Sequence, residues 1–286
     1  MKTHVVLSSC AAMPTGDGDE NPLLRELARR GVAARWQPWG QPPDDGQLVV
    51  LRATWDYADR LEPFLDWCAT VPRLANPYKV VAGNLDKRYL AQLAAAGLPV
   101  IPTAVHEVGA ELDVPAADFV IKPVVGAGSR GAGRFTARDA GEARAHLREL
   151  HARGLAALVQ PYQASVDEQG ETSLIFFHGR YSHAFTKGPM LKGGRVDTGT
   201  ALYLEERLGP ARPDADMIGV GAECLAAAAH EYGVTGEQLL YARVDMTRGR
   251  AGPELLELEL AEPSLCLRFG GPAAYSTFAD AIESLL

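Results

Sequence analysis

The sequence predicts an α/β (α+β) protein, in which an N-terminal parallel α/β lobe precedes a larger region with antiparallel strands. Strand and helix patterns alternate over residues 1–84, an order that favours parallel strands joined by helices. Further along, short apolar strands come in pairs joined by turn residues, which is typical of antiparallel hairpins. The 286 residues and the 47% hydrophobic content are enough for more than one hydrophobic core.

The first lobe, residues 1–84, is expected to bind a substrate. Pro22 and Gly31 bound its first helix, because proline suits the first helical turn and glycine the stop. A second helix is expected over residues 59–70. Strands are expected at residues 5–9, 32–36 and 48–52.

Polar residues directly follow the third of these strands. Ligands of open α/β sheets bind beyond the carboxyl ends of the strands. We therefore expect Arg52 to hold a substrate carboxylate and Asp56 an amine, with Thr54 and Tyr57 beside them. The alternative for the aromatic residues of this segment is packing in a core or between lobes. The acidic loop around Asp17 lacks the full calcium-loop pattern and is interpreted as a polar loop near the substrate.

Residues 85–160 are expected to form a small subdomain with a glycine-rich lid loop, and residues 161–286 a larger one. The expected helices cover residues 84–96, 139–153 and 224–232, and a last one begins at Pro272. The expected strands cover residues 119–122, 134–136 and 155–160, a pair within 172–185 that turns at His178-Gly179, and a hairpin of 239–246 with 254–260.

Composition excludes several classes of function. A net charge of -8, from 28 basic and 36 acidic residues, argues against nucleic-acid binding. No apolar run approaches the ~20 residues that span a bilayer, and the N-terminus resembles a first strand more than a signal peptide. The four cysteines are far apart, which predicts reduced thiols in a cytoplasmic protein and no zinc site.

A strand that ends in Lys122 leads into a loop containing Gly126, Gly128 and Ser129. Glycines let backbone N–H groups approach phosphate oxygens closely. The spacing Gly126-x-Gly128-x-x-Gly131 resembles a dinucleotide fingerprint, but a strand follows it where that fingerprint requires a helix. The remaining interpretations are a phosphate-binding lid and a plain hairpin loop.

Three acids lie on the C-terminal hairpin. Glu257 and Glu259 are two apart and share one strand face, and Asp245 on the preceding strand can face the same side. Converging carboxylates repel one another unless a cation lies between them, and hard oxygen ligands suit Mg²⁺. Arg243 shares the face of Asp245 and is the candidate for stabilising a transferring phosphoryl group. The alternative is a solvated polar strand face.

In this order the motifs resemble those of the ATP-grasp superfamily, in its glutathione-synthetase-like branch. The resemblance runs from Asn84 to the C-terminus. It implies ATP and Mg²⁺ as cofactors, with Arg243 catalytic and the three acids as metal ligands. It also implies that ten residues contact the nucleotide: Lys87, Lys122, Gly126, Gly128, Ser129, Gln160, Pro161, Tyr162, Glu171 and, as the alternative ribose ligand, Glu168. The family's usual last metal ligand is asparagine, so Glu259 adds negative charge there.

The segments around Thr54, Asp86 and Ser264 are similar to those of one subgroup, which includes O-ureido-serine cyclo-ligases. This resemblance implies a carbon–nitrogen ligase of antibiotic biosynthesis that activates a small amino-acid-like carboxylate as an acyl phosphate. The expected reaction is closure of O-ureido-D-serine to D-cycloserine, with Ser264 near the substrate. The partners expected are this small substrate and a second copy in a homo-oligomer. The alternatives are a bimolecular carboxylate–amine ligase and a non-catalytic nucleotide-sensing module.

Overall fold

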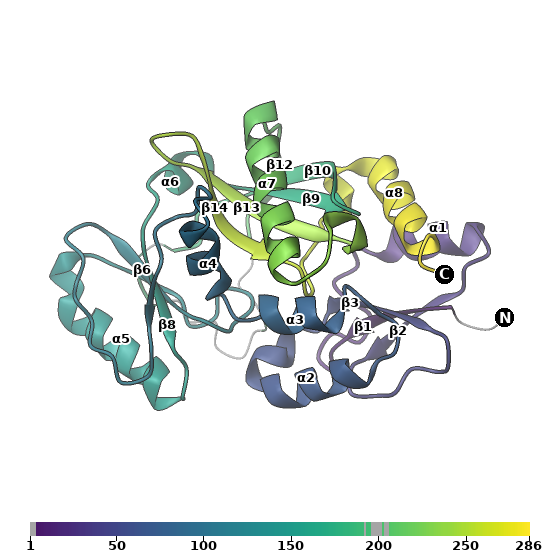
Figure 1. Ribbon diagram of the computed structural model, residues 1–286, viewed down its shortest axis with the longest axis horizontal. Helices are drawn as coiled ribbons and strands as arrows, with labels where there is room; N and C mark the ends of the chain where they lie inside the picture. The colour runs from purple at the N-terminus through teal and green to yellow at the C-terminus, as the bar shows by residue number, and fades with distance from the viewer. Residues whose placement is uncertain (1–3, 192, 196–201, 203–205) are drawn as a thin grey trace.

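Three sheets organise the computed structural model, which describes residues 4–191, 193–195, 202 and 206–286. The N-terminal sheet has the order β2-β1-β3-β4, and every neighbouring pair in it is parallel, as the sequence predicts. Helices α2 and α3 lie beside this sheet (Figure 1). The elements of the lobe are β1 (Val5–Ser9), α1 (Asn21–Arg29), β2 (Ala34–Pro38), β3 (Leu48–Ala53), α2 (Leu61–Thr70), β4 (Leu74–Ala75) and α3 (Tyr78–Asn84).

The second sheet is antiparallel and carries the glycine-rich loop. Its strand order is β11-β7-β6-β8-β5, and helix α5 packs against β6, β7 and β8 through a small apolar core. The glycine-rich loop joins β6 to β7. The elements are α4 (Tyr89–Ala95), β5 (Ala104–His106), β6 (Phe119–Pro123), β7 (Gly133–Phe135), α5 (Ala140–Ala152), β8 (Ala157–Pro161) and β11 (Gly194–Arg195).

The third sheet is also antiparallel, with the order β12-β10-β9-β13-β14. Long helix α7 covers one face, and α8 lies toward the N-terminal lobe beside α1 (Figure 1). The predicted turn at His178-Gly179 is present, with both residues at positive φ. The elements are α6 (Ser165–Gln169), β9 (Glu171–Phe177), β10 (Arg180–Lys187), β12 (Leu208–Pro210), α7 (Ala215–Glu231), β13 (Ala242–Arg248), β14 (Pro253–Glu259) and α8 (Gly271–Glu283).

The helix predicted to begin at Asn84 is wrong in its boundary, because α3 ends at Asn84 and α4 begins only at Tyr89. The Asn84 side chain is hydrogen-bonded to the backbone of β14: its Nδ2 donates to the Leu258 carbonyl at 2.9 Å and its Oδ1 accepts from the Leu260 N–H at 2.6 Å. The break between the helices places Lys87 beside β6, where its N–H donates to the Val124 carbonyl at 2.9 Å.

Helix α7 starts earlier than the sequence predicts. Asp214 caps it by accepting a hydrogen bond from the Met217 N–H at 2.9 Å. The first turns of α7 are rich in glycine, which weakens their helical signal in the sequence. Gly221 packs closely on β9, because a Cβ there would lie 2.6 Å from the end of the Leu174 side chain and that side chain would have to shift.

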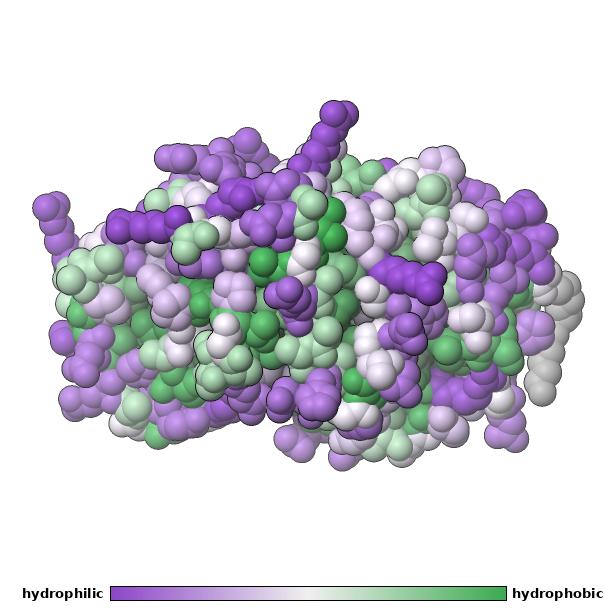
Figure 2. Space-filling model, turned by 45° about the horizontal axis from the view of Figure 1, so that its top comes forward, coloured by the Kyte–Doolittle hydropathy of each residue, from purple (hydrophilic) through white to green (hydrophobic). Residues whose placement is uncertain are grey.

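Hydrophilic side chains cover most of the face that Figure 2 shows, and hydrophobic side chains gather between them. Among the described residues, the exposed large hydrophobic side chains are Tyr78, Val108 and Leu286. In the part of the chain with described structure, no helix is long and apolar enough to cross a membrane. All four cysteines are buried and free, in line with the expected reduced thiols.

Candidate active site

A cavity of about 440 Å³ lies where the three sheets meet. Its walls come from the N-terminal lobe, the glycine-rich loop, strands β8 and β14, and the segment after β14. Most of the predicted site residues line it. Those that do are Tyr57, Lys87, Lys122, Gly126, Gly128, Ser129, Gln160, Pro161, Tyr162, Glu171, Arg243, Glu257, Glu259 and Ser264.

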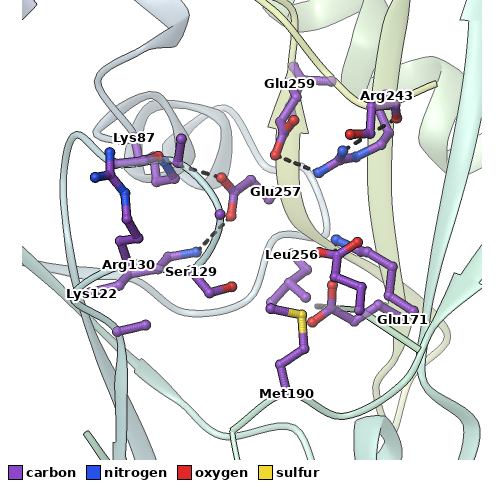
Figure 3. A pocket seen from close by; sticks show the side chains of 18 of the residues that line it. Lys87, Lys122, Ser129, Arg130, Glu171, Met190, Arg243, Leu256, Glu257 and Glu259 are labelled. Carbon is purple, nitrogen blue, oxygen red and sulfur yellow. Dashed lines mark hydrogen bonds and ion pairs between the residues drawn. The ribbon is translucent and has the colours of Figure 1, made fainter. Parts of the chain in front are cut away.

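Two lysines share one carboxylate in this cavity. Lys122 Nζ lies 3.1 Å from Glu257 Oε2, and Lys87 Nζ lies 3.3 Å from Glu257 Oε1 (Figure 3). Burial alone raises the pKa of Glu257, but Lys122 and Lys87 outweigh it and hold that pKa well below its ordinary range. Two cations against one anion leave a local positive charge, which suits a phosphate group in a protein of net charge -8.

The glycine-rich loop is held in a conformation that needs glycine. Gly128 and Gly131 have φ of +60° and +74°, and Ser129 between them shares the left-handed region at +59°. The Gly126 carbonyl accepts a hydrogen bond from Lys87 Nζ at 2.7 Å. The loop therefore touches the first lysine directly, and its backbone lies beside the positive region.

Arg130 of this loop reaches across to the N-terminal lobe. Its Nη1 donates to Asp59 Oδ2 at 2.7 Å and its Nη2 to the Trp55 carbonyl at 3.4 Å. The sequence offered no sign of this contact, because the partners are 71 and 75 residues apart in the chain. It joins the loop to the segment that follows β3.

The C-terminal hairpin places the predicted charges in opposed pairs. In the register of β13 and β14, Arg243 lies opposite Glu259 and Asp245 opposite Glu257. Arg243 Nη2 donates to Glu259 Oε1, as Figure 3 shows, and Arg243 Nε donates to Asp245 Oδ1 at 3.0 Å. Buried Asp245 also accepts from Lys187 Nζ at 2.7 Å.

The pKa values of this cluster follow from burial and from these pairs. Burial opposes the charge of Asp245, yet Arg243 and Lys187 lower its pKa below the ordinary value. Burial raises the pKa of Glu259 to about 7, with Glu257 and Asp245 acting in the same direction and Arg243 against it. Of the three predicted metal ligands, Glu259 is therefore the one whose pKa lies above its ordinary value.

Two of the three predicted metal ligands line the cavity, and Asp245 does not. Glu257 and Glu259 line the cavity from the same strand, whereas the Asp245 oxygens are occupied by Lys187, Arg243 and Ser173. Among the described residues, no three Asp, Glu, His or Cys side chains are close enough to form a metal site by themselves. Magnesium commonly takes one or two protein carboxylates and completes its shell with water and phosphate oxygens. The donor set thus fits Mg²⁺ bound together with a phosphate, and the role of Asp245 as a ligand stays a prediction.

The opposite end of the cavity is apolar and is bounded by the end of β8. Gln160, Pro161 and Tyr162 line it together with Val120 and Met190. The Gln160 side chain donates to Thr103 Oγ1 at 2.8 Å, which fixes its orientation. An apolar slot beside a strand end, with backbone groups at its edge, is suited to a planar base.

Of the two ribose candidates, Glu171 lines the cavity and Glu168 is exposed outside its lining. Glu171 Oε2 lies 2.9 Å from Lys187 Nζ. Lys187 was missed at the sequence level, although it alternates along β10 toward the face that carries the acids. Burial lowers the pKa of Lys187, but Asp245 and Glu171 raise it well above the ordinary value, so the lysine is charged.

The residues predicted to bind the substrate differ most from expectation. We call the part of the cavity beside Tyr57 and Ser264 the substrate end. Tyr57 and Ser264 line the cavity, whereas Arg52, Thr54 and Asp56 are absent from its lining. Arg52 is buried, its Nη2 lies 2.9 Å from Glu20 Oε1, and its guanidinium lies over the Tyr241 ring. Asp56 accepts from Trp39 Nε1 at 2.6 Å. Their assignment to substrate binding stays a prediction. The described contacts give Arg52 and Asp56 structural partners, whereas Thr54 Oγ1 is buried without a hydrogen-bond partner among the described residues.

Several other residues reach this end of the cavity. Asp17 lines it, and the interpretation of its loop as a polar segment near the substrate stays a prediction. Trp55, Glu262 and Arg268 also line it. Glu262 follows the acids of β14 in a visible acidic motif, but the sequence offered no reason to separate its role from theirs.

Comparison with known proteins decides the family. The chain is 39% identical over 288 residues to the cycloserine biosynthesis protein DcsG of Streptomyces lavendulae, and the match covers 94% of each chain. The chain belongs to the D-cycloserine synthetase family. Residues 5–76 of this synthetase-family chain match the domain described as the N-terminal domain of D-cycloserine synthetase DcsG.

Solved structures agree with this membership. The crystal structure of D-cycloserine synthetase DcsG is 38% identical, covers 99% of both chains and superimposes with a TM-score of 0.84. The ATP-grasp ligase PsnB, in complex with minimal precursor, Mg and ADP, has a TM-score of 0.61 at 18% identity and covers 100% of this chain and 98% of its own. The second likeness shows the fold alone. This member of the synthetase family is an ATP-grasp ligase, as the sequence motifs predict.

Proposed function

We propose that this chain closes O-ureido-D-serine to D-cycloserine with the hydrolysis of ATP to ADP and phosphate. The proposal is supported by the position of the family match in the structure. The segment that matches the D-cycloserine synthetase N-terminal domain, residues 5–76, includes Trp55 and Tyr57 at the substrate end of the cavity. The rest of the cavity carries the lysines and acids expected of an ATP-grasp ligase, so the two halves of the reaction share one cavity.

The nucleotide fits the cavity in one direction. Lys87 and Lys122 would bind the phosphates as point charges, exchanging their shared partner Glu257 for phosphate oxygens. The base would lie at the apolar end near Tyr162, with the ribose near Glu171. Glu257 and Glu259 would hold Mg²⁺, which when bound neutralises charge on the phosphate oxygens.

The chemistry proceeds in three steps. A carboxylate oxygen of the substrate takes the γ-phosphoryl group, and ADP leaves. The ureido nitrogen that is bonded to oxygen then attacks the acyl carbon, phosphate leaves, and the five-membered ring closes. The carbamoyl group leaves on hydrolysis as carbon dioxide and ammonia. Arg243, at the cavity wall, would stabilise the negative charge that develops on the acyl oxygen.

The protein must also keep water from the acyl phosphate. We call the part of the cavity around Lys87 and Lys122 the phosphate end. The glycine-rich loop lies beside it, and Arg130 joins the loop to Asp59 of the N-terminal lobe. This contact keeps the loop beside the substrate end while the intermediate exists.

The test is phosphate release from Mg·ATP in the presence of small amino acids, with products identified by mass spectrometry. The proposal predicts release with O-ureido-D-serine alone and a product of the mass of cycloserine. Release that appears only when a second amine is added would replace the cyclase with a bimolecular ligase. Nucleotide binding without ADP formation under any condition would instead favour a sensing module.

A further inference from the structure

Glu262 is a buried acid at the substrate end of the cavity. It is 6% exposed and lines the cavity three residues after Glu259, outside the set that would hold phosphate and metal. The Trp55 Nε1–H donates to its backbone carbonyl at 3.3 Å, which ties this segment to the N-terminal lobe.

The Glu262 carboxyl lies near a tyrosine hydroxyl and, among the described residues, has no cation paired with it. The Tyr57 side chain, also buried, lines the same cavity, and after burial the charge of Glu262 is the next cause that raises the pKa of its hydroxyl. Within the described part of the chain Glu262 forms no ion pair, although Arg243, Arg52 and Lys87 act on it from a distance. Burial, and next the charge of Glu259, raises the pKa of Glu262 well above its ordinary value. Because this buried carboxyl lines the cavity without an ion-pair partner of its own, it can pair with a cationic ligand group without breaking an existing ion pair.

The other acids of the cavity are less suited to such a ligand. Glu171, Glu257 and Glu259 already form ion pairs with Lys187, with Lys87 and Lys122, and with Arg243, respectively. Asp17 is exposed, so water already solvates its charge. Glu206 also lines the cavity, and its charge already acts on two cations, because it raises the pKa of both Lys187 and Arg243.

We infer that Glu262, beside the Tyr57 hydroxyl, binds the α-ammonium group of the substrate. This inference rests on the proposed function and names how that site selects its substrate class. The substrate carboxylate would then point from Glu262 toward Lys87 and Arg243, where the phosphoryl group is transferred. The enzyme would therefore select α-amino acids over carboxylic acids of the same length that lack the amine.

The experiment measures binding by calorimetry in the presence of Mg²⁺ and a non-hydrolysable ATP analogue. Its two ligands are O-ureido-D-serine and 3-(ureidooxy)propanoate, which differ only in the α-amine. Wild type is expected to bind the second about 10- to 100-fold more weakly, because a buried ion pair is lost. Glu262→Gln is expected to weaken binding of the first by a similar factor, and to leave the two ligands within about threefold of each other.

Three further variants complete the comparison. Tyr57→Phe is expected to lower affinity for O-ureido-D-serine by a smaller factor, since only the neighbouring hydroxyl is lost. Glu62→Gln removes an exposed carboxylate on α2 and is expected to behave as wild type. Asp17→Asn tests the rival acid. If Asp17→Asn removes the discrimination and Glu262→Gln preserves it, the ammonium belongs to Asp17 and the inference is wrong.

The comparison of the two ligands uses the wild-type protein, so it does not depend on whether any variant folds. Equal affinity for both would overturn the inference by itself. Phosphate release, measured in parallel, separates this failure from failure of the proposed function. Selective binding of O-ureido-D-serine without turnover would contradict the cyclase and support the Glu262 assignment, whereas binding of neither ligand would contradict both.

Discussion

Lys187 Nζ lies 2.7 Å from Asp245 Oδ2, and both side chains are buried. Lys187 also pairs with Glu171, so one lysine joins two acids of neighbouring strands. Removing Lys187 would leave Glu171 without its cation and would leave the buried Asp245 carboxylate with Arg243 as its one remaining cation among the described residues. Lys187→Met is therefore expected to lower the free energy of unfolding by about 3 kcal/mol, measured by urea denaturation. Lys79→Met, on the exposed surface of α3, is the control and should change it by less than about 1 kcal/mol.

Glu257→Gln should abolish turnover without unfolding the protein. Glu257 faces both lysines of the phosphate end, and we assign it to Mg²⁺. Loss of this carboxylate is expected to lower kcat by at least about 100-fold, with a nearly unchanged circular dichroism spectrum. Glu254→Gln alters the same strand outside the cavity lining and serves as the control. Product formation at the wild-type rate in Glu257→Gln would remove the metal assignment.

Arg130→Ala should uncouple ATP use from ring closure. The contact of Arg130 with Asp59 holds the glycine-rich loop near the N-terminal lobe, and without it water gains access to the acyl phosphate. The expected result is a rise in phosphate released per molecule of product, measured by parallel phosphate and mass-spectrometric assays. Arg138→Ala, an exposed arginine near the start of α5, should keep the wild-type ratio. An unchanged ratio in Arg130→Ala would mean that the contact does not protect the intermediate.

His146 should make the folded protein sensitive to mild acid. Burial lowers the pKa of His146 below 6.5, and its Nε2 lies 3.0 Å from the Gly131 carbonyl oxygen. As pH falls below 6.5, the unfolded histidine takes up a proton that the folded one resists, so stability is present above pH 6.5 and is lost below it. His146→Gln should reduce the loss of unfolding free energy between pH 7 and pH 5.5 by up to about 1 kcal/mol. Identical pH profiles for the variant and wild type would contradict this assignment.

Arg52→Ala distinguishes a substrate contact from a structural ion pair. The structure pairs Arg52 with buried Glu20, so the variant should lose about 3–5 kcal/mol of unfolding free energy. The KM for the amino-acid substrate, measured where the variant is still folded, should stay within about threefold of wild type. A large rise in this KM without a loss of unfolding free energy would instead support a direct contact between Arg52 and the substrate.

The sequence predicted what depends on local pattern. Alternating strands and helices predicted the parallel lobe. The spacing of Glu257 and Glu259 predicted that they share one strand face, and both line the cavity. It did not predict contacts set by distant parts of the chain. The helix boundary at Asn84 was wrong because that side chain bonds to β14, which lies 174 residues away. Arg52 and Glu20 form a buried ion pair. Because the two residues are 32 positions apart, no local sequence pattern indicates that they pair.

The measurement that tests the central claim most directly traces the ring nitrogen. O-ureido-D-serine labelled with ¹⁵N at the nitrogen bonded to oxygen is incubated with enzyme and Mg·ATP in an excess of unlabelled hydroxylamine. The account predicts one phosphate per molecule of cycloserine, with the label fully retained in the ring. Formation of an open hydroxamate from the added hydroxylamine as the main product, without labelled cycloserine, would contradict it.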